Sequence, residues 1–306
     1  MPHDASALLF PGQGSQTDTM LDGLASLDPF QRRYALMTDV LGQDLLEELH
    51  AGRTSIHANV TGSLLIILAS AVSLDLLKHQ QAIGGPIMGL AGYSVGQWVA
   101  LYAASAITFE QLVRIVHRRA SLMDDCAAAN PGGMIAVIGV GEDLLHRFCA
   151  DMRKRGDFAA IANYNALGQY SISVEKGAMT AAMEELQTLK PMKTIELQAA
   201  GPWHSELMRP ASDEFGRFLE AEEFRAPEVP TIDNVTGDFL PMNTASWRKT
   251  LAEHISRPVR WSQGVEALIA RGAVRCIETG YGNMLSKFGF FINRDVQHIT
   301  ARSLTG

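Results

Sequence analysis

Short apolar runs that end in glycine-rich turns are the clearest pattern in the first hundred residues. Residues 7–10 are apolar and are followed by Pro11-Gly-Gln-Gly14, and residues 86–93 form a second such run that ends at Ser94. Each run predicts a buried strand that ends in a tight loop. Residues 97–104 then continue as a helix. This succession of strand, turn and helix is typical of an α/β protein with a parallel sheet.

Two longer segments of the same region predict helices. Residues 64–74 are the most apolar stretch, but they contain two serines and end at Asp75. The stretch is therefore too short and too interrupted to span a bilayer, and it indicates a buried helix. Residues 109–125 repeat apolar side chains along one helical face, which predicts a helix that packs on a core.

The pattern changes after residue 130. Alternating and continuous apolar runs predict strands at 134–140, 158–164, 169–174 and 192–197, and helices at 142–155 and 178–189. This order of strand, helix, strand, strand, helix, strand is that of the ferredoxin-like unit. Because α/β character returns after residue 200, with a helix at 214–221 and a strand at 274–278, we expect an inserted domain. The sequence predicts a ferredoxin-like domain of residues 131–198 inside a larger α/β domain of residues 1–130 and 199–306.

Composition and charge narrow the function classes. Of the 306 residues, 47% are hydrophobic and 19% charged, which predicts a globular protein and excludes disorder over most of the chain. The formal net charge of -7 gives no general attraction to nucleic acid or anionic lipid, so neither a nucleic acid nor a membrane is expected as a partner.

The cysteines and the chain start indicate the compartment. Cys126, Cys149 and Cys276 lie far apart without CxxC spacing, which argues against a disulfide framework or a zinc site. No secretory signal is visible at the start, and a cytoplasmic protein is expected. Two Asn-x-Thr triplets, at Asn59 and Asn234, would matter only in a secreted protein and are given no role.

The turn at Ser94 carries the strongest candidate chemistry. Gly92-Tyr-Ser-Val-Gly96 matches G-x-S-x-G, the nucleophile elbow, with a strand before it and a helix after it. The glycines allow a tight turn that exposes the serine, and the next backbone N–H points into the site at a helix N-terminus. The alternative is a glycine-rich turn with an incidental serine. Ser94 is the leading candidate nucleophile.

A serine hydroxyl needs a base, and the chain has nine histidines. His204 lies in a Gly/Pro turn between the predicted small domain and the next helix, where its side chain can reach an interdomain cleft. The alternative for His204 is a surface-turn or helix-cap histidine. His254 is a second candidate.

Two further segments are candidates for contacting a substrate. The loop at Pro11-Gly-Gln-Gly14 would place backbone and amide donors at the carboxyl ends of the strands, as part of an oxyanion hole, a phosphate nest or a plain turn. Arg118 and Arg119 lie on the helix at 109–125. If one points inward, it requires a carboxylate partner; the alternative is two solvated arginines.

Taken together, these segments resemble the malonyl-CoA:acyl carrier protein transacylase family, which includes the acyltransferase domains of polyketide and fatty acid synthases. The resemblance covers nearly the whole chain and depends on the order of the motifs rather than on any one of them. The motifs are Phe10-Pro-Gly-Gln-Gly-Ser-Gln16, Gly92-Tyr-Ser-Val-Gly96, Val113-Arg-Ile-Val-His-Arg-Arg119, Gly133-Met-Ile-Ala-Val, Asn163-Tyr-Asn-Ala-Leu-Gly-Gln169, His204-Ser-Glu-Leu-Met208, Pro258-Val-Arg-Trp261 and Glu278-Thr-Gly-Tyr-Gly282. The resemblance implies an α/β-hydrolase-like core with a ferredoxin-like insert.

The resemblance also assigns roles to particular residues. It makes Ser94 the acylated nucleophile and His204 its base, and it places His254 where a backbone carbonyl orients that histidine. Gln13 and the backbone N–H of Val95 would hold the oxyanion. The arginine that pairs with the malonyl carboxylate aligns with Arg119 rather than with Arg118.

The implied activity is malonyl transfer from coenzyme A to the phosphopantetheine thiol of an acyl carrier protein. Malonyl-CoA and the carrier protein are then the partners, the CoA thioester is a substrate, and no metal or redox cofactor is expected. Docking of an acidic carrier would need local basic residues, either Arg153-Lys-Arg155 or a group made of Arg257, Arg260 and Lys287.

The chain departs from the usual family pattern at four positions. Tyr93 replaces a histidine, Gln97 a glutamate and Tyr281 a proline, and Trp203 matches neither pattern usual for malonyl- or methylmalonyl-selective enzymes. Three alternatives stay open: the acyltransferase subunit of a malonate decarboxylase, an acyl hydrolase that acts on acyl carrier proteins, and a non-catalytic carrier-binding subunit of a synthase. Acyl preference and pathway are open too.

Overall fold

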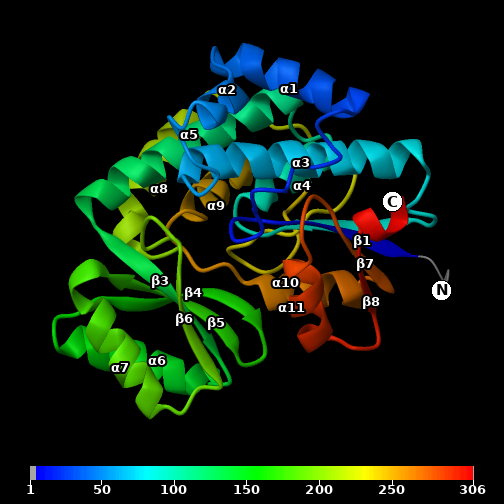
Figure 1. Ribbon diagram of the computed structural model, residues 1–306. Helices are drawn as coiled ribbons and strands as arrows, with labels where there is room; N and C mark the ends of the chain where they lie inside the picture. The colour runs from blue at the N-terminus through cyan, green and yellow to red at the C-terminus, as the bar shows by residue number, and fades with distance from the viewer. Residues whose placement is uncertain (1–4, 306) are drawn as a thin grey trace.

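The larger part of the fold is built on a four-stranded parallel sheet. In the computed structural model, which describes residues 5–305, its strands are β1 (Ser6–Phe10), β2 (Ile87–Gly92), β7 (Arg275–Glu278) and β8 (Gln297–Thr300), in the order β2-β1-β7-β8 (Figure 1). The central strand β1 is buried along its whole length, which explains its continuous apolar sequence. The predicted α/β fold with a parallel sheet is confirmed. The loops that follow β1 and β2 leave the same edge of the sheet.

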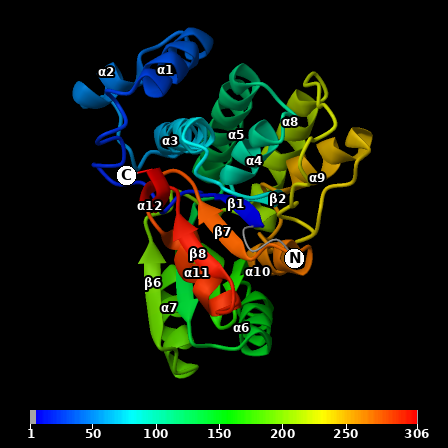
Figure 2. The same ribbon diagram turned by 90° about the vertical axis from the view of Figure 1, so that its right-hand side faces the viewer.

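Helices cover this sheet. They are α1 (Asp28–Leu41), α2 (Leu45–His50), α3 (Asn59–His79), α4 (Gly96–Ala103), α5 (Phe109–Ala129), α8 (Arg209–Leu219), α9 (Trp247–Glu253), α10 (Trp261–Ala270), α11 (Met284–Ile292) and α12 (Arg302–Thr305). Figure 2 shows α3, α4 and α5 on one side of the sheet and α10 and α11 on the other.

The apolar stretch at 64–74 is the middle of α3. Within the described residues, α3 is the one helix long and apolar enough to cross a membrane, yet 83% of that apolar window is buried inside the protein. It packs against α1, α4 and α5. Its hydrophobic character is therefore that of a core helix surrounded by other elements.

The middle of the chain forms a second, antiparallel sheet. Its strands are β3 (Gly132–Ile138), β4 (Ala159–Ala166), β5 (Gln169–Glu175) and β6 (Lys193–Leu197), in the order β4-β5-β3-β6. The helices α6 (Glu142–Lys154) and α7 (Met179–Thr188) cover the face turned away from the parallel sheet (Figure 1). This part has an apolar core of its own, centred on Ile135, Leu145 and Ile172.

Backbone and side-chain hydrogen bonds join the two parts at β4. Val259 N–H donates to the carbonyl of Ala162 at 2.8 Å, and Tyr164 N–H donates to the carbonyl of Val259 at 2.9 Å. The Tyr93 hydroxyl, from the turn after β2, donates to Asn165 Oδ1 at 2.7 Å. The turn after β2 is therefore tied directly to the small sheet.

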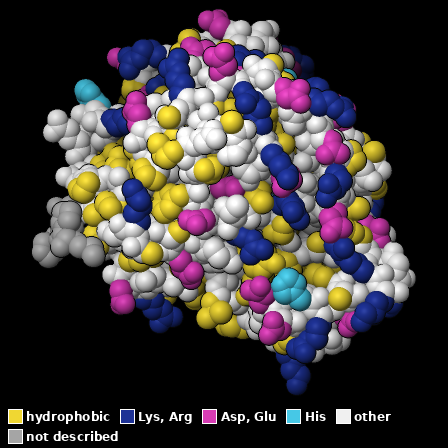
Figure 3. All heavy atoms as spheres, turned by 180° about the vertical axis from the view of Figure 1, so that it is seen from behind, with side chains coloured by type: hydrophobic (Ala, Val, Ile, Leu, Met, Phe, Trp, Pro, Cys, Tyr) yellow, Lys and Arg dark blue, Asp and Glu magenta, His cyan; other side chains and the backbone are white. Residues whose placement is uncertain are grey.

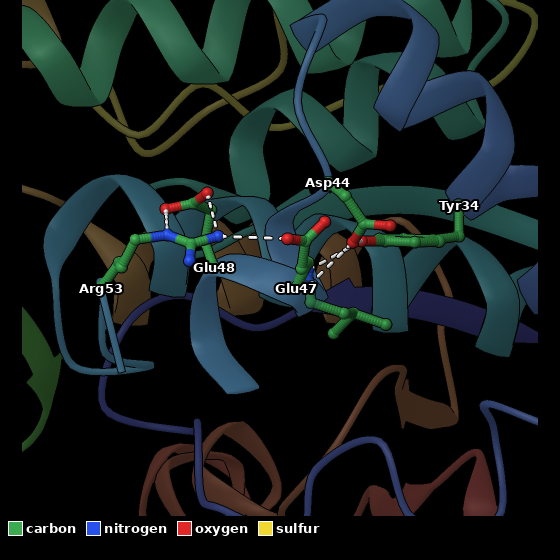
Figure 4. Close-up of polar contacts among 6 residues, drawn as sticks. Tyr34, Asp44, Glu47, Glu48 and Arg53 are labelled. Atoms are coloured by element: carbon green, nitrogen blue, oxygen red, sulfur yellow. Dashed lines mark hydrogen bonds and ion pairs between the residues drawn. The ribbon is translucent and has the colours of Figure 1, made fainter. Parts of the chain in front are cut away.

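A polar cluster closes the corner between α1 and α2 (Figure 4). The Tyr34 hydroxyl donates to Asp44, which caps α2 by accepting from Glu47 N–H at 2.9 Å. Arg53 binds Glu48 through two N–H donors, at 2.9 and 2.8 Å. These contacts hold the turn that leads from α2 toward the start of α3.

Several elements differ from the sequence-based expectation. The helix expected at 214–221 is α8, which begins at Arg209 because Pro210 occupies its first turn, a position that favours proline. Thr231 and Ile232 form isolated bridges to Leu90 and Phe239, a feature for which there was no sequence-based prediction. Strand β8 and helix α11 were not predicted from the sequence. For β8 the reason is that a half-exposed strand of four residues has a pattern too short to identify.

Candidate active site

The turn between β2 and α4 is a sharp elbow with Ser94 at its tip. Ser94 has φ 51°, in the left-handed region that non-glycine residues rarely adopt. A Cβ on Gly92 would lie 2.0 Å from the carbonyl carbon and oxygen of Gly96, and a Cβ on Gly96 would lie 2.1 Å from the oxygen of Phe10. Both glycines are therefore required, because backbone packs directly on backbone at these two positions.

Two amide side chains brace the elbow. Asn234 Oδ1 accepts from Ser94 N–H at 2.9 Å, and Asn234 Nδ2 donates to the carbonyl of Gly92 at 2.6 Å. Gln97 Nε2 donates to the carbonyl of Ile232 at 2.8 Å, while Gln97 Oε1 accepts from Asn234 N–H at 3.0 Å. An ionised glutamate at position 97 could only accept. The amide therefore fits this position, where one atom donates and the other accepts.

His204 lies against the serine. Its Nε2 is 2.8 Å from Ser94 Oγ, and its Nδ1 is 2.8 Å from the backbone carbonyl of His254. Because a carbonyl oxygen only accepts, Nδ1 carries the hydrogen, and the bare Nε2 accepts from the serine hydroxyl. His204 also has a positive φ, 56°. His254 contacts His204 through its backbone carbonyl.

Burial keeps the imidazole of His204 neutral. Burial first, and the positive charge of Arg119 second, lower the pKa of His204 to about 3. The ring of His254 is fully buried, with its centroid 5.2 Å from that of His204, and burial lowers its pKa well below the ordinary value. The imidazole next to Ser94 is thus unprotonated far below neutral pH.

The loop after β1 brings Gln13 to the elbow. A Cβ on Gly12 would lie 2.4 Å from the carbonyl oxygen of Tyr93, so this loop packs directly on the residue before Ser94. The side-chain amide of Gln13 points away to Asn59 and Ser63. Among the described residues, neither the backbone N–H of Gln13 nor that of Val95 has an acceptor. Gln13 therefore offers its backbone N–H, and its side chain is engaged elsewhere.

The two neighbouring arginines have opposite environments. Arg118 is exposed, whereas Arg119 is 2% exposed and its Nη2 donates to Ser94 Oγ at 3.3 Å. Within residues 5–305 no carboxylate pairs with Arg119, and its Nε has no hydrogen-bond partner. Burial lowers the pKa of Arg119 to about 10, so the guanidinium remains charged at neutral pH. A buried, unpaired cation beside a serine is a site for an anionic group.

These groups surround one cavity of about 460 Å³. Gln13, Ser94, Trp203 and His204 line it, together with residues of β6 and the segment after it. Arg119 and Val95 do not line it but adjoin Ser94. Among residues 5–305, no group of three or more His, Cys, Asp or Glu side chains is arranged to hold a metal ion.

The two candidate basic groups differ in where their side chains lie. Each basic side chain of the α6 group is paired with a carboxylate: Arg153 with Glu206, Lys154 with Asp151 and Arg155 with Glu185. Lys287 lines a groove that shares Gly14 with the cavity. From behind, acidic and basic side chains are interspersed over the surface (Figure 3). Arg257 of the second group also pairs with Glu253, at 3.9 Å, so it is the place of Lys287 beside the groove that favours this group for an acidic partner.

Sequence reasoning missed Asn59 and Asn234. Asn59 is 4% exposed and binds Gln13, and Asn234 is 2% exposed and binds Ser94. Each lies in an Asn-x-Thr triplet, and neither side chain is accessible in the folded protein. Both asparagines sit next to elements far from them in sequence, so the only local signal was that triplet.

Known proteins with similar sequences and structures are acyl-transfer enzymes. A scan against protein-family models finds no match. The chain is 31% identical over 297 residues to malonyl CoA-acyl carrier protein transacylase of Bacillus subtilis, covering 96% of this chain and 92% of the relative. It matches the acyl-carrier-protein S-malonyltransferase of Burkholderia pseudomallei with a TM-score of 0.89 at 27% identity, over 97% and 96% of the two chains. A malonyl-transacylase in complex with its type II PKS acyl-carrier protein matches with a TM-score of 0.88 at 28% identity, over 97% and 94%.

The elbow glycines allow a direct test of the close packing. We predict that Gly92→Ala lowers the free energy of unfolding by about 3 kcal/mol or more, the upper range for overpacking, because the added methyl meets only backbone atoms. Urea unfolding measures this. The control is Gly177→Ala, where an added Cβ meets nothing within 4 Å. A Gly92→Ala protein with the wild-type midpoint would contradict the packing argument.

The neutral His204 predicts an unusual pH profile. We expect the rate at which phenylmethanesulfonyl fluoride modifies Ser94 to stay level from pH 7.5 to 5, because the base, with a pKa of about 3, is not protonated in that range. A histidine with the ordinary pKa near 6.5 would instead give about a tenfold loss by pH 5.5. Intact-protein mass spectrometry at a series of pH values measures the rate. An inflection near pH 6.5 would sink the assignment.

Proposed function

The chain belongs to the malonyl-CoA:acyl carrier protein transacylase family, and from this premise we propose that it moves a malonyl group from coenzyme A to the phosphopantetheine thiol of an acyl carrier protein through an ester on Ser94. The observation that carries the proposal is the hydrogen bond of 2.8 Å between Ser94 Oγ and His204 Nε2, beside the buried and unpaired Arg119. Ser94 and His204 supply a nucleophile and its base, and Arg119 supplies a binding position for the malonyl carboxylate.

In the first half-reaction, His204 Nε2 takes the proton of Ser94 as Oγ attacks the thioester carbonyl. The backbone N–H groups of Gln13 and Val95 donate to the oxyanion that forms. The carbon–sulfur bond then breaks, and the proton on His204 passes to the departing thiolate of coenzyme A. The His254 carbonyl keeps the imidazole in the required tautomer and stabilises its charged form while it lasts.

The second half-reaction uses the same groups in reverse. His204 takes the proton of the carrier's phosphopantetheine thiol, the sulfur attacks the malonyl ester, and the serine oxygen leaves with the proton from His204. No step requires a metal ion or a redox cofactor. The paired arginines of α6 support placing the carrier near Lys287, whose groove adjoins the cavity.

Arg119 would select substrates that carry a carboxylate. A neutral acetyl group leaves the buried guanidinium without a partner, and such an unsatisfied charge costs more than a missing methylene group. The presence of this buried arginine also favours a transferase over an acyl hydrolase as the function of the chain.

The finer architecture belongs to the same proposal. The antiparallel sheet order β4-β5-β3-β6, with α6 and α7 on one face, supports a ferredoxin-like domain of residues 131–198. Residues 1–130 and 199–306 then form an α/β-hydrolase-like catalytic domain with the nucleophile elbow after β2. A cytoplasmic location accords with the three buried, unpaired cysteines.

The acyl-serine itself is the first test. We expect malonyl-CoA to add one malonyl group to the protein, with none added to Ser94→Ala, and a carrier-protein thiol to remove it. Intact-protein mass spectrometry measures the adduct, with methylmalonyl-CoA and acetyl-CoA as competing donors. Release of free malonate without a lasting adduct would indicate the hydrolase, and no reaction with any thioester would indicate a non-catalytic subunit. Adduct formation with transfer only to a decarboxylase carrier would assign the chain to malonate breakdown.

The selectivity of Arg119 is tested by substitution. We expect Arg119→Ala to lower kcat/KM for malonyl-CoA about 100-fold or more, since hydrogen bonds to a charged group contribute about 3 kcal/mol, and to change acetyl transfer far less. Arg118→Ala is the matched control, because it removes the same side chain at an exposed neighbouring position. Equal losses for the two acyl groups would refute the role.

A further inference from the structure

Asn59 holds the loop that carries Gln13. Gln13 Nε2 donates to Asn59 Oδ1 at 2.6 Å, to the Asn59 carbonyl at 3.1 Å and to Ser63 Oγ at 3.1 Å. All three acceptors lie within the first five residues of α3. The side chain of Gln13 therefore acts as an anchor: it ties a residue that lines the cavity, and whose backbone N–H has no acceptor among the described residues, to a buried helix.

Asn59 is held in turn by α5. Its Nδ2 donates to Asp124 Oδ1 at 2.8 Å and to the Ala120 carbonyl at 3.0 Å. The Asn59 side chain is thus satisfied on both sides, with Oδ1 facing Gln13 and Nδ2 facing α5, so it cannot rotate without breaking hydrogen bonds. Ala120 directly follows Arg119, which contacts Ser94.

This arrangement links three parts of the site through one buried amide. The same short stretch of α5 carries Arg119, which reaches Ser94, and the acceptors that hold Asn59. Asn59 in turn fixes the position of Gln13 through hydrogen bonds. The loop that carries Gln13 also packs on the elbow through Gly12. An N–H donor stabilises an oxyanion only if it is held in place before the reaction, because a mobile donor must be reordered at the transition state.

We propose that Asn59, held by Asp124, is a positioning residue for acyl transfer: it keeps the backbone N–H of Gln13 aimed at the oxyanion on the acyl group of Ser94. The proposal rests on the proposed function for the identity of the acyl group, and on the hydrogen bonds alone for the position of Gln13. Asn59 lines the cavity but forms no hydrogen bond with Ser94, and in this proposal it acts through the hydrogen bonds that hold Gln13.

The test separates positioning from general damage. We expect Asn59→Ala and Asp124→Ala to lower the single-turnover rate of Ser94 acylation by malonyl-CoA about 10- to 100-fold, part of the 10²- to 10³-fold effect of deleting an oxyanion donor. The dissociation constant for malonyl-CoA, measured on Ser94→Ala backgrounds, should change less than about twofold, because the donor acts on the transition state. Asp124→Asn, which keeps an acceptor oxygen, should restore most of the rate.

Asp125→Ala is the matched control, because Asp125 is the exposed neighbour of Asp124 and forms no hydrogen bond or ion pair among residues 5–305. The proposal is overturned if Asn59→Ala acylates at the wild-type rate. It is overturned equally if rate, affinity and thermal midpoint fall together and Asp124→Asn is no better than Asp124→Ala.

A second reaction keeps this test independent of the acyl donor. Phenylmethanesulfonyl fluoride places a sulfonyl oxygen at the same N–H donors, so its rate with Ser94 should fall in the same variants. A wild-type protein that accepts no acyl thioester refutes the proposed function. The sulfonylation rates then still decide whether Asn59 positions Gln13.

Discussion

Direct contact of backbone with backbone around Ser94 is the constraint on which the rest of the site depends. Gly12, Gly92 and Gly96 each lie where a Cβ would come within 2.4 Å of a main-chain atom. With these contacts, the loop after β1 and the elbow after β2 become one unit. The parallel pairing of β1 and β2 brings them to the same edge of the sheet, and the missing side chains let them meet there.

The electrostatics of the site follow from the same close packing. Water is excluded from His204 and Arg119, which are 3% and 2% exposed. Exclusion of water lowers the pKa of both side chains, yet it leaves them in opposite states at neutral pH, with the imidazole neutral and the guanidinium charged. The positive charge of Arg119 also lowers the pKa of His204. Burial together with one unpaired cation therefore keeps the imidazole of His204 neutral, and the same cation leaves a buried position that suits an anion.

The parts of this site whose contacts are local in the sequence were easier to predict than those whose partners are far away along the chain. The strand, the turn and the helix around Ser94 are local, so their pattern was visible in five residues. His204 is 110 residues from Ser94, so its Gly/Pro turn made it a candidate base but did not separate it from a surface-turn histidine, and the resemblance was needed to choose it. Asn59 and Asn234 could not be found at all, because their partners lie 46 and 140 residues away and nothing in their own neighbourhoods indicates burial. The order of strands and helices along residues 132–197 was predictable, because apolar side chains repeat with a different spacing in strands than in helices.

Tyr93 shows how a departure from the family pattern can be accommodated by the surrounding structure. Its ring packs edge-on against Trp261 and lies near Phe288. Burial raises the pKa of its hydroxyl, which stays protonated and donates to Asn165 Oδ1 on β4. A tyrosine is long enough to reach from the turn after β2 to the small sheet, so the residue next to Ser94 also joins the two parts of the protein. Since the cavity is lined from both parts, a bond that holds β4 against the elbow also holds the shape of the space in which the acyl group must fit.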